Sequence, residues 1–372
     1  MALRALPYVP VEDLHDRPHV LVDGATRAGS VLTLSHWPQS PTPAALARDL
    51  SAGIVFAFLH ASQGRLPRRS GRSSVAVRAA IVAAGRAEAV TNDHFDEDGL
   101  VSVFAMTEPE IALRNEELLL DVASCGDFGV VSSRTAARIA FAIGPLGEQA
   151  AAEASEAGVL AERPGSWSGP RYRAVLERTV ELLGHPERFR RYWEHEDAAL
   201  AASEEELRTG SVRIDEVPEV DLAVVTRTGP DTRPADRVAA GRAERATPIH
   251  EVALHSATSA SRILTFDDGR CELYLRYEGW VRYMSRQVPL RPDLALLGEA
   301  LTSVEPTANR WVADGVGSIV TRMRPEPEGR TGLDAAVVAS TVVAYLKSAP
   351  AAWDPFRPGG ALVPVDEGRH PK

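Results

Sequence analysis

The segment Asn92–Gly99, NDHFDEDG, concentrates one imidazole and four acidic side chains within six positions. His94, Asp96 and Asp98 stand at alternate positions, so in an extended segment their side chains point to one side. One imidazole and two carboxylates on the same side of a loop are suitable ligands for a divalent cation such as Mn²⁺ or Mg²⁺. Without a cation, these neighbouring carboxylates would repel one another. The segment therefore predicts a site for one or two metal ions, with His94, Asp96 and Asp98 as ligands and catalytic residues.

A simpler interpretation of the same segment is a solvated turn or a helix cap. Asp98 stands before an apolar run and could cap a helix that begins there, where the helix dipole favours negative charge. Asp93 could hold the loop through backbone amides or bind the metal, and the sequence does not decide between the two. The apolar residues on both sides favour the metal site, because they place the segment between a buried strand and a buried helix.

The elements around this segment predict an α/β fold. Apolar runs at 20–22, 31–36 and 87–91 predict strands, and the pattern at 44–60 predicts a helix that begins after Thr42 and Pro43. Strands that alternate with helices favour a mostly parallel sheet with flanking helices, and ligands of such sheets bind at the carboxyl ends of the strands. His36 ends the second run and is predicted as a further metal ligand. Asp23, before Gly24, is predicted as a turn residue.

The second half of the chain has a different pattern. Arg262–Phe266, the turn Asp267-Asp268-Gly269 and Cys271–Tyr277 predict a β-hairpin, because Asp-Gly readily adopts the positive φ of a tight turn. We therefore expect two domains. Residues 1–235 would form an α/β metal-site domain with a helical insertion, and residues 236–372 a smaller α+β domain that contains the antiparallel hairpin.

The motif His94-x-Asp96-x-Asp98-Gly99-x-x-Ser102, between a strand and an apolar helix, resembles the first motif of the DHH phosphoesterase superfamily. The resemblance covers about a dozen residues. It implies a pair of Mn²⁺ ions held by such aspartates and histidine, and a water molecule activated for attack on phosphorus. It also implies that Ser102 lies near this site.

The same resemblance suggests roles for two residues outside the motif. Asp127, in the segment CGDFG, would stand for the superfamily's second aspartate as a metal ligand, and His36 would replace a histidine. The chain contains no Asp-His-His triplet and no Gly-Gly-Gly-His. These departures support a second hypothesis, a non-catalytic ligand- or partner-binding protein on a hydrolase-like scaffold. An iron oxygenase with a histidine and carboxylate triad is a third hypothesis. The whole chain is also similar to a set of uncharacterised actinobacterial proteins that share the LSHWP and NDHFDxDG segments.

Charge and composition limit the partners. With 41 basic and 51 acidic residues, the net charge of -10 argues against strong binding of duplex nucleic acid. We expect instead a small phosphorylated molecule or a short oligonucleotide as substrate. Its phosphate would be bound by arginines, whose donors match two oxygens at once; the candidates are Arg134, Arg138, Arg282 and Arg286.

Several other function classes lack support in the sequence. There is no GxSxG, GxGxxG or P-loop pattern, and no apolar stretch of the length that a membrane helix needs. We therefore expect a cytoplasmic protein with no membrane partner. The sequence leaves open whether the protein forms a homodimer. Cys125 and Cys271 form no CxxC pair and are expected to be buried, reduced thiols.

Overall fold

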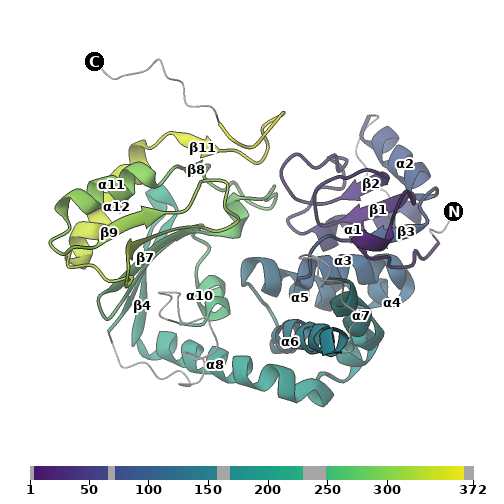
Figure 1. Cartoon of the computed structure of the whole chain (residues 1–372), viewed down its shortest axis with the longest axis horizontal. Helices are drawn as coiled ribbons and strands as arrows, with labels where there is room; N and C mark the ends of the chain where they lie inside the picture. Colours follow the sequence, from purple (N-terminus) through teal and green to yellow (C-terminus); the bar gives the residue numbers. More distant parts are fainter. Residues whose placement is uncertain (1–3, 66–71, 157–167, 229–248, 364–372) are drawn as a thin grey trace. The chain divides into compact units, whose positions relative to one another are not determined.

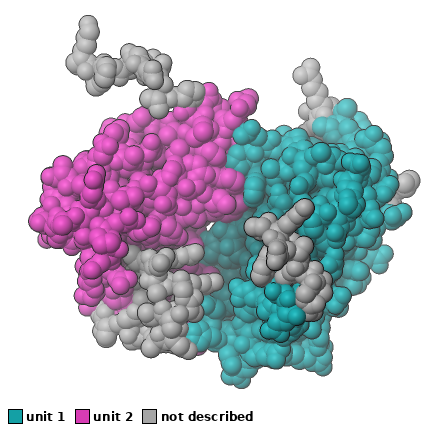
Figure 2. All heavy atoms as spheres, viewed as in Figure 1, with its two compact units in different colours: residues 1–197, 283–285 teal, residues 198–282, 286–372 magenta. Residues whose placement is uncertain are grey.

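The computed structural model describes residues 4–65, 72–156, 168–228 and 249–363 of the 372-residue chain. The chain divides into two compact units (Figure 2): unit 1 comprises residues 1–197 and 283–285, and unit 2 comprises residues 198–282 and 286–372. The predicted boundary at 235/236 lies outside the described residues, whereas the two units divide between Asp197 and Ala198. We describe each unit by itself.

Unit 1 contains a parallel sheet with the strand order β2-β1-β3 (Figure 1). Its strands are β1 (His19–Val22), β2 (Ser30–Leu34) and β3 (Ala89–Thr91). Val22 pairs with Leu34, and Leu21 pairs with Thr91. The residues that follow the three strands therefore emerge at one edge of the sheet, as expected for parallel strands.

Helices make up most of the rest of unit 1. They are α1 (Ser51–Ser62), α2 (Arg72–Ala84), α3 (Glu97–Thr107), α4 (Pro109–Arg114), α5 (Glu116–Phe128), α6 (Arg134–Glu156), α7 (Ser168–Gly184) and the first part of α8 (Arg190–Thr209). Helix α3 packs against both α1 and α5. All of its residues from Asp98 to Met106 are buried, which confirms the buried helix predicted after the acidic segment.

The helix predicted at 44–60 begins later, at Ser51, so this boundary was wrong. The hydroxyl of Thr42 does not cap a helix; it accepts a hydrogen bond from the backbone N–H of Ser35 at 2.9 Å. The first amides of α1 instead donate to the buried carboxylate of Asp98. A tertiary contact with a residue far along the chain therefore fixes where α1 begins.

Unit 2 is built on a mixed sheet with the strand order β4-β5-β6-β7-β10-β9, in which only the β5–β6 pair is parallel. Its strands are β4 (Val212–Val217), β5 (Leu222–Arg227), β6 (Arg262–Asp267), β7 (Arg270–Leu275), β9 (Arg310–Ala313) and β10 (Thr321–Glu326). Two short strands, β8 (Arg291–Pro292) and β11 (Ala351–Trp353), form a separate pair.

The described part of unit 2 contains the second part of α8, from Ala198 onward, and the helices α10 (Glu251–Ala257), α11 (Ala295–Val304) and α12 (Ala335–Ser348). Residues of α11 and α12 share one apolar core with the sheet, as in Leu297, Val342 and Leu273. The predicted hairpin is confirmed as β6–β7, with φ values of 47° at Asp268 and 74° at Gly269.

The broad α/β prediction is thus confirmed, although the described parallel sheet of unit 1 is small. None of the described helices has both the length and the apolar character needed to cross a membrane. Cys125 and Cys271 are buried and free of disulfides.

Candidate metal centre

Histidine and aspartate side chains gather at the carboxyl edge of the unit 1 sheet in two groups that share Asp23. One group comprises Asp23, His36 and Asp98, and the other comprises Asp23, His94 and Asp96. Within each group, one possible ligand atom of every residue lies within 4.8 Å of the others. An octahedral cation with bonds of about 2.1 Å has opposite ligands about 4.2 Å apart, so each group has nearly the span of a cation site.

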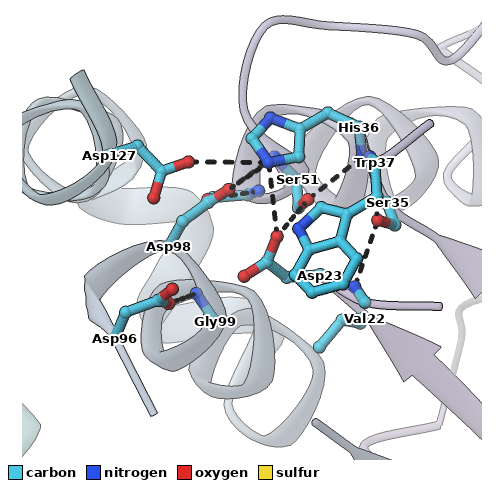
Figure 3. Close-up of polar contacts among 12 residues, drawn as sticks. Val22, Asp23, Ser35, His36, Trp37, Ser51, Asp96, Asp98, Gly99 and Asp127 are labelled. Atoms are coloured by element: carbon cyan, nitrogen blue, oxygen red, sulfur yellow. Dashed lines mark hydrogen bonds and ion pairs between the residues drawn. The ribbon is translucent and has the colours of Figure 1, made fainter. Parts of the chain in front are cut away.

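The first group, which we call the inner group, surrounds the Nε2 atom of His36 (Figure 3). This atom lies 3.5 Å from Asp23 Oδ1 and 4.0 Å from Asp98 Oδ2. It also lies 3.6 Å from Asp127 Oδ2, so Asp127 joins the same cluster. The side chains of His36 and Asp98 are inaccessible to solvent, and that of Asp23 is 2% exposed.

The strands and the loop that follows them set the orientation of His36. His36 comes two residues after β2, and its Nδ1 is 2.5 Å from the backbone oxygen of Asp49. Because a carbonyl oxygen only accepts, Nδ1 carries the proton, and Nε2 is left as the nitrogen that can bind a cation. That nitrogen faces the three carboxylates, which is the arrangement of a metal-binding imidazole.

Asp98 lies in the first turn of α3, and its carboxylate faces the start of α1. Its Oδ2 accepts from the backbone N–H of Ser51 at 2.7 Å, and its Oδ1 accepts from that of Ala52 at 2.8 Å. The positive end of the α1 dipole therefore stabilises this buried negative charge. Each carboxylate oxygen keeps a further lone pair for a cation.

Asp127 reaches the cluster from the last turn of α5. The preceding residue, Gly126, packs so closely against α3 that a Cβ atom there would lie 2.6 Å from the Cβ of Glu97. The absence of a side chain at Gly126 thus allows α5 to bring Asp127 beside His36. The Oδ2 atom of Asp127 is buried and has no hydrogen-bond partner among the described residues.

The second group, which we call the outer group, is centred on His94 and is more accessible. His94 Nε2 lies 2.8 Å from Asp96 Oδ2 and 3.3 Å from Asp23 Oδ2, and its Nδ1 lies 3.1 Å from Asp93 Oδ1. The side chains of His94 and Asp96 are each 33% exposed. The ring of Trp37 packs near that of His94, with centroids 5.3 Å apart. Solvent and solutes therefore reach the centre from the outer group.

Burial and charge change the pKa values of these residues in different directions. Burial lowers the pKa of His36. Burial also opposes a charge on His94, but hydrogen bonds to Asp23 and neighbouring acids outweigh it and raise the pKa of His94. Asp23 is fully buried, yet its contacts with His94 and His36 lower its pKa. For Asp98 and Asp127, burial and then the surrounding carboxylates raise the pKa well above the ordinary value.

The structure differs from the expectation that the side chains of His94, Asp96 and Asp98 point to one side. Asp96 is the extended N-cap of α3, and its side chain accepts from Gly99 N, whereas Asp98 is already helical. A helix turns side chains about its axis, so Asp98 faces the inner group while Asp96 faces the outer group. Asp23, predicted as a turn residue, does have a positive φ of 45°, but its buried side chain joins the two groups.

Gly99 is closely surrounded by polar groups. A Cβ atom at this position would lie 2.6 Å from Asn92 Nδ2, 2.7 Å from the Tyr172 hydroxyl and 3.0 Å from Asp96 Oδ1. Polar groups of three residues therefore lie against the backbone of Gly99, and only glycine leaves them room. Neither Asn92 nor Tyr172 was foreseen from the sequence.

Two arginines proposed for phosphate binding are occupied elsewhere in unit 1. Arg134 Nε lies 2.5 Å from Asp197 Oδ1, and Arg138 Nη2 lies 3.2 Å from Asp197 Oδ2. Arg138 also pairs with Glu187 at 3.1 Å. These contacts connect α6 to α8 and use guanidinium donors of both arginines, so the proposed role of the two residues with substrate stays a prediction.

The other two arginines, Arg282 and Arg286, belong to unit 2. Arg282 Nε donates to the backbone oxygen of Pro355 at 3.4 Å, and Arg286 Nη1 lies 3.3 Å from Asp221 Oδ2. Their proposed role with substrate stays a prediction.

The donor set and the unpartnered carboxylate oxygen fit a divalent cation. Carboxylate oxygens with one imidazole nitrogen per group suit Mn²⁺ and Mg²⁺ better than thiophilic metals. Buried polar atoms almost always have a partner, and Asp127 Oδ2 has none in the described protein. His36, Asp23, Asp98 and Asp127 could hold one ion, and Asp23, His94 and Asp96 a second.

The fold and the cluster define an α/β protein with a candidate two-cation centre at the edge of a parallel sheet. The chain belongs to the DUF6687 family, a family of unknown function whose model matches residues 4–357. No curated protein and no solved structure has significant similarity to it.

Proposed function

We propose that this protein is a metal-dependent, phosphoesterase-like hydrolase that acts on a small phosphate-containing substrate. The observation that carries the proposal is the position of Asp23, whose Oδ1 lies 3.5 Å from His36 and whose Oδ2 lies 3.3 Å from His94. One carboxylate between two histidine and aspartate groups is the arrangement by which proteins hold paired divalent cations. When bound, such a pair activates a water molecule and neutralises charge on a phosphoryl group.

The residues of the inner and outer groups would have different roles. His36, Asp98 and Asp127 are shielded from solvent, so they would bind and orient an ion without direct contact with bulk water. His94 and Asp96 are partly exposed, and a substrate would approach on their side. Because Arg134 and Arg138 are paired with Asp197, recognition of the phosphate would depend mainly on the cations.

The net charge of the chain bears on the class of substrate. A small phosphorylated molecule or a short oligonucleotide fits an acidic chain that must attract its substrate through bound cations rather than through a basic surface. The distant resemblance of the NDHFDEDG segment to the first DHH phosphoesterase motif supports hydrolysis at phosphorus. The alternative is a binding protein that keeps the cluster without turnover.

Hydrolysis of a generic phosphodiester tests the proposal. Protein stripped of metal with a chelator is assayed on bis-p-nitrophenyl phosphate and on a dinucleotide, before and after addition of Mn²⁺. We expect turnover only with Mn²⁺, and a loss of roughly a hundredfold or more in Asp98→Asn and in Asp96→Asn, because each removes a charged ligand. Asp121→Asn, on α5 but outside the cluster, is the matched control and should keep its activity.

The outcomes separate the two hypotheses. Equal Mn²⁺-dependent activity in the wild type and both ligand variants would refute the proposed site. Stoichiometric Mn²⁺ in the purified protein, with no hydrolysis of any phosphate ester, would support the binding protein instead.

A further inference from the structure

Ser51, at the first position of α1, contacts all three residues of the inner group. Its backbone N–H donates to Asp98 Oδ2 at 2.7 Å, and its hydroxyl donates to Asp23 Oδ1 at 2.7 Å. The same hydroxyl accepts from the backbone N–H of His36 at 3.2 Å. Ser51 is fully buried, and Figure 3 shows its side chain between His36 and Asp23. No sequence motif pointed to this residue.

The direction of the Ser51 hydroxyl is fixed by its two partners. A serine hydroxyl has one proton to donate, and here the N–H of His36 occupies a lone pair on Oγ. The proton is therefore directed at Asp23 Oδ1. A buried hydrogen bond to a carboxylate is among the stronger ones, so it fixes the rotation of that carboxylate.

This rotation decides which group each oxygen of Asp23 serves. With Oδ1 held by Ser51, Oδ1 faces the inner group and Oδ2 faces His94 in the outer group. Without that bond, the Asp23 carboxylate could turn and offer both oxygens to one cation. We propose that Ser51 is a positioning residue that holds Asp23 in the bridging orientation and thereby allows two cations to bind together. This inference rests on the proposed function.

The test compares Mn²⁺ binding by the wild type, Ser51→Ala and Ser62→Ala. Ser62 is the matched control, because it lies in the same helix, is buried and donates a 2.7 Å hydrogen bond, but to the backbone oxygen of Leu59. Calorimetric titration gives the number and affinity of the ions, and electron paramagnetic resonance of Mn²⁺ reports whether two ions are coupled. Thermal unfolding of the metal-free proteins shows whether the variants are folded.

We expect two coupled ions in the wild type and in Ser62→Ala. In Ser51→Ala we expect affinity for the second ion to fall by about 10–100-fold, the usual effect of losing a partner of a metal ligand, and the coupled signal to disappear. Ser51→Cys fills a similar volume with only a weak donor, and it should show the same loss. It replaces Ser51→Ala in the comparison if the alanine variant does not fold.

Two results would overturn the inference in distinguishable ways. Two coupled ions with wild-type affinity in Ser51→Ala or Ser51→Cys would remove the role of Ser51 and leave the proposed function intact. A wild type that binds no Mn²⁺ would end the proposed function and this inference together.

Discussion

Asp127→Asn should stabilise the metal-free protein and remove its stabilisation by Mn²⁺. The substitution keeps the size of the side chain and removes one negative charge from a buried cluster. Within the described parts of the chain, Asp127 Oδ2 has no hydrogen-bond partner to lose, and its contact with His36 adds little, because burial lowers the pKa of that imidazole and favours its neutral form. In the metal-free protein the charge of Asp127 is therefore opposed mainly by burial and by the neighbouring carboxylates, of which Asp98 acts most strongly and Asp96 next.

The distances set the size of the effect. Asp127 Oδ2 and Asp98 Oδ2 lie 3.6 Å and 4.0 Å from the same atom of His36. The two oxygens are then at most about 8 Å apart, and at an effective dielectric of about 20 two full charges at that separation repel by about 2 kcal/mol. The raised pKa of both acids means that part of this repulsion is already relieved by protonation. We expect a net gain of roughly 1 kcal/mol, or about 2–4 °C in the unfolding midpoint of a unit of this size.

Thermal unfolding with a chelator and with excess Mn²⁺ measures both halves of the prediction. Mn²⁺ at a hundred times its dissociation constant should raise the stability of the wild type by about 2.7 kcal/mol and that of Asp127→Asn much less. The order of the two midpoints should therefore reverse when Mn²⁺ is added. Asp121, on the same helix, accepts from Ser132 N at 2.7 Å and Ser133 N at 2.9 Å, so Asp121→Asn should be destabilised in both conditions. A metal-free Asp127→Asn protein that is less stable than the wild type would refute the reasoning.

Two further substitutions test the surroundings of the cluster. Gly126→Ala would place a Cβ atom 2.6 Å from Glu97 Cβ, so α5 must shift. We expect the free energy of unfolding to fall by about 1–3 kcal/mol and Mn²⁺ to bind more weakly in a titration. Unchanged Mn²⁺ affinity would show that binding does not depend on the exact position of α5. Burial raises the pKa of Asp197, but hydrogen bonds from Arg138 and Arg134 outweigh it and leave that pKa lowered. The contribution of Asp197 to the stability of the folded protein is therefore present above the pKa of the unfolded state, about 3.9, and is lost as the pH falls through the lower pKa of the folded state. Asp197→Asn should lower the free energy of unfolding, measured with urea at pH 7, by roughly 1 kcal/mol relative to the wild type. A difference of the same size between the two proteins at about pH 2 would contradict this reasoning.

The sequence allowed prediction of what depends on local pattern. A buried strand before the acidic segment and a buried helix after it follow from runs of apolar residues, and the Asp268-Gly269 hairpin follows from turn chemistry. His36 and Asp127 were placed near the segment from strand ends and a motif resemblance, and the structure brings both to within 4.0 Å of a cluster residue.

What could not be predicted depends on contacts between distant segments. The Asp23-Gly24 pair has the pattern of an ordinary turn, and nothing local shows that this turn is buried against His94, 71 positions later. The start of α1 at Ser51 depends on a carboxylate that comes 47 positions later, at Asp98. Similarly, Arg134 has a partner 63 positions away, so its availability for phosphate could not be judged in a chain rich in arginine.

The solvated-turn interpretation of the acidic segment is correct for only part of it. Asp96 does cap α3, as a structural role would require, and Asp93 lies at the surface. Asp98 and Asp23 are at most 1% exposed, and a carboxylate in such a position is costly unless its charge is compensated. The amides of α1 compensate Asp98 in part and His94 compensates Asp23 in part, but the buried Asp127 Oδ2 accepts no hydrogen bond from any residue that the structure describes. A purely structural cluster would be more stable with an amide or an apolar residue at Asp127, so the buried carboxyl group at this position is the feature that argues for a cation.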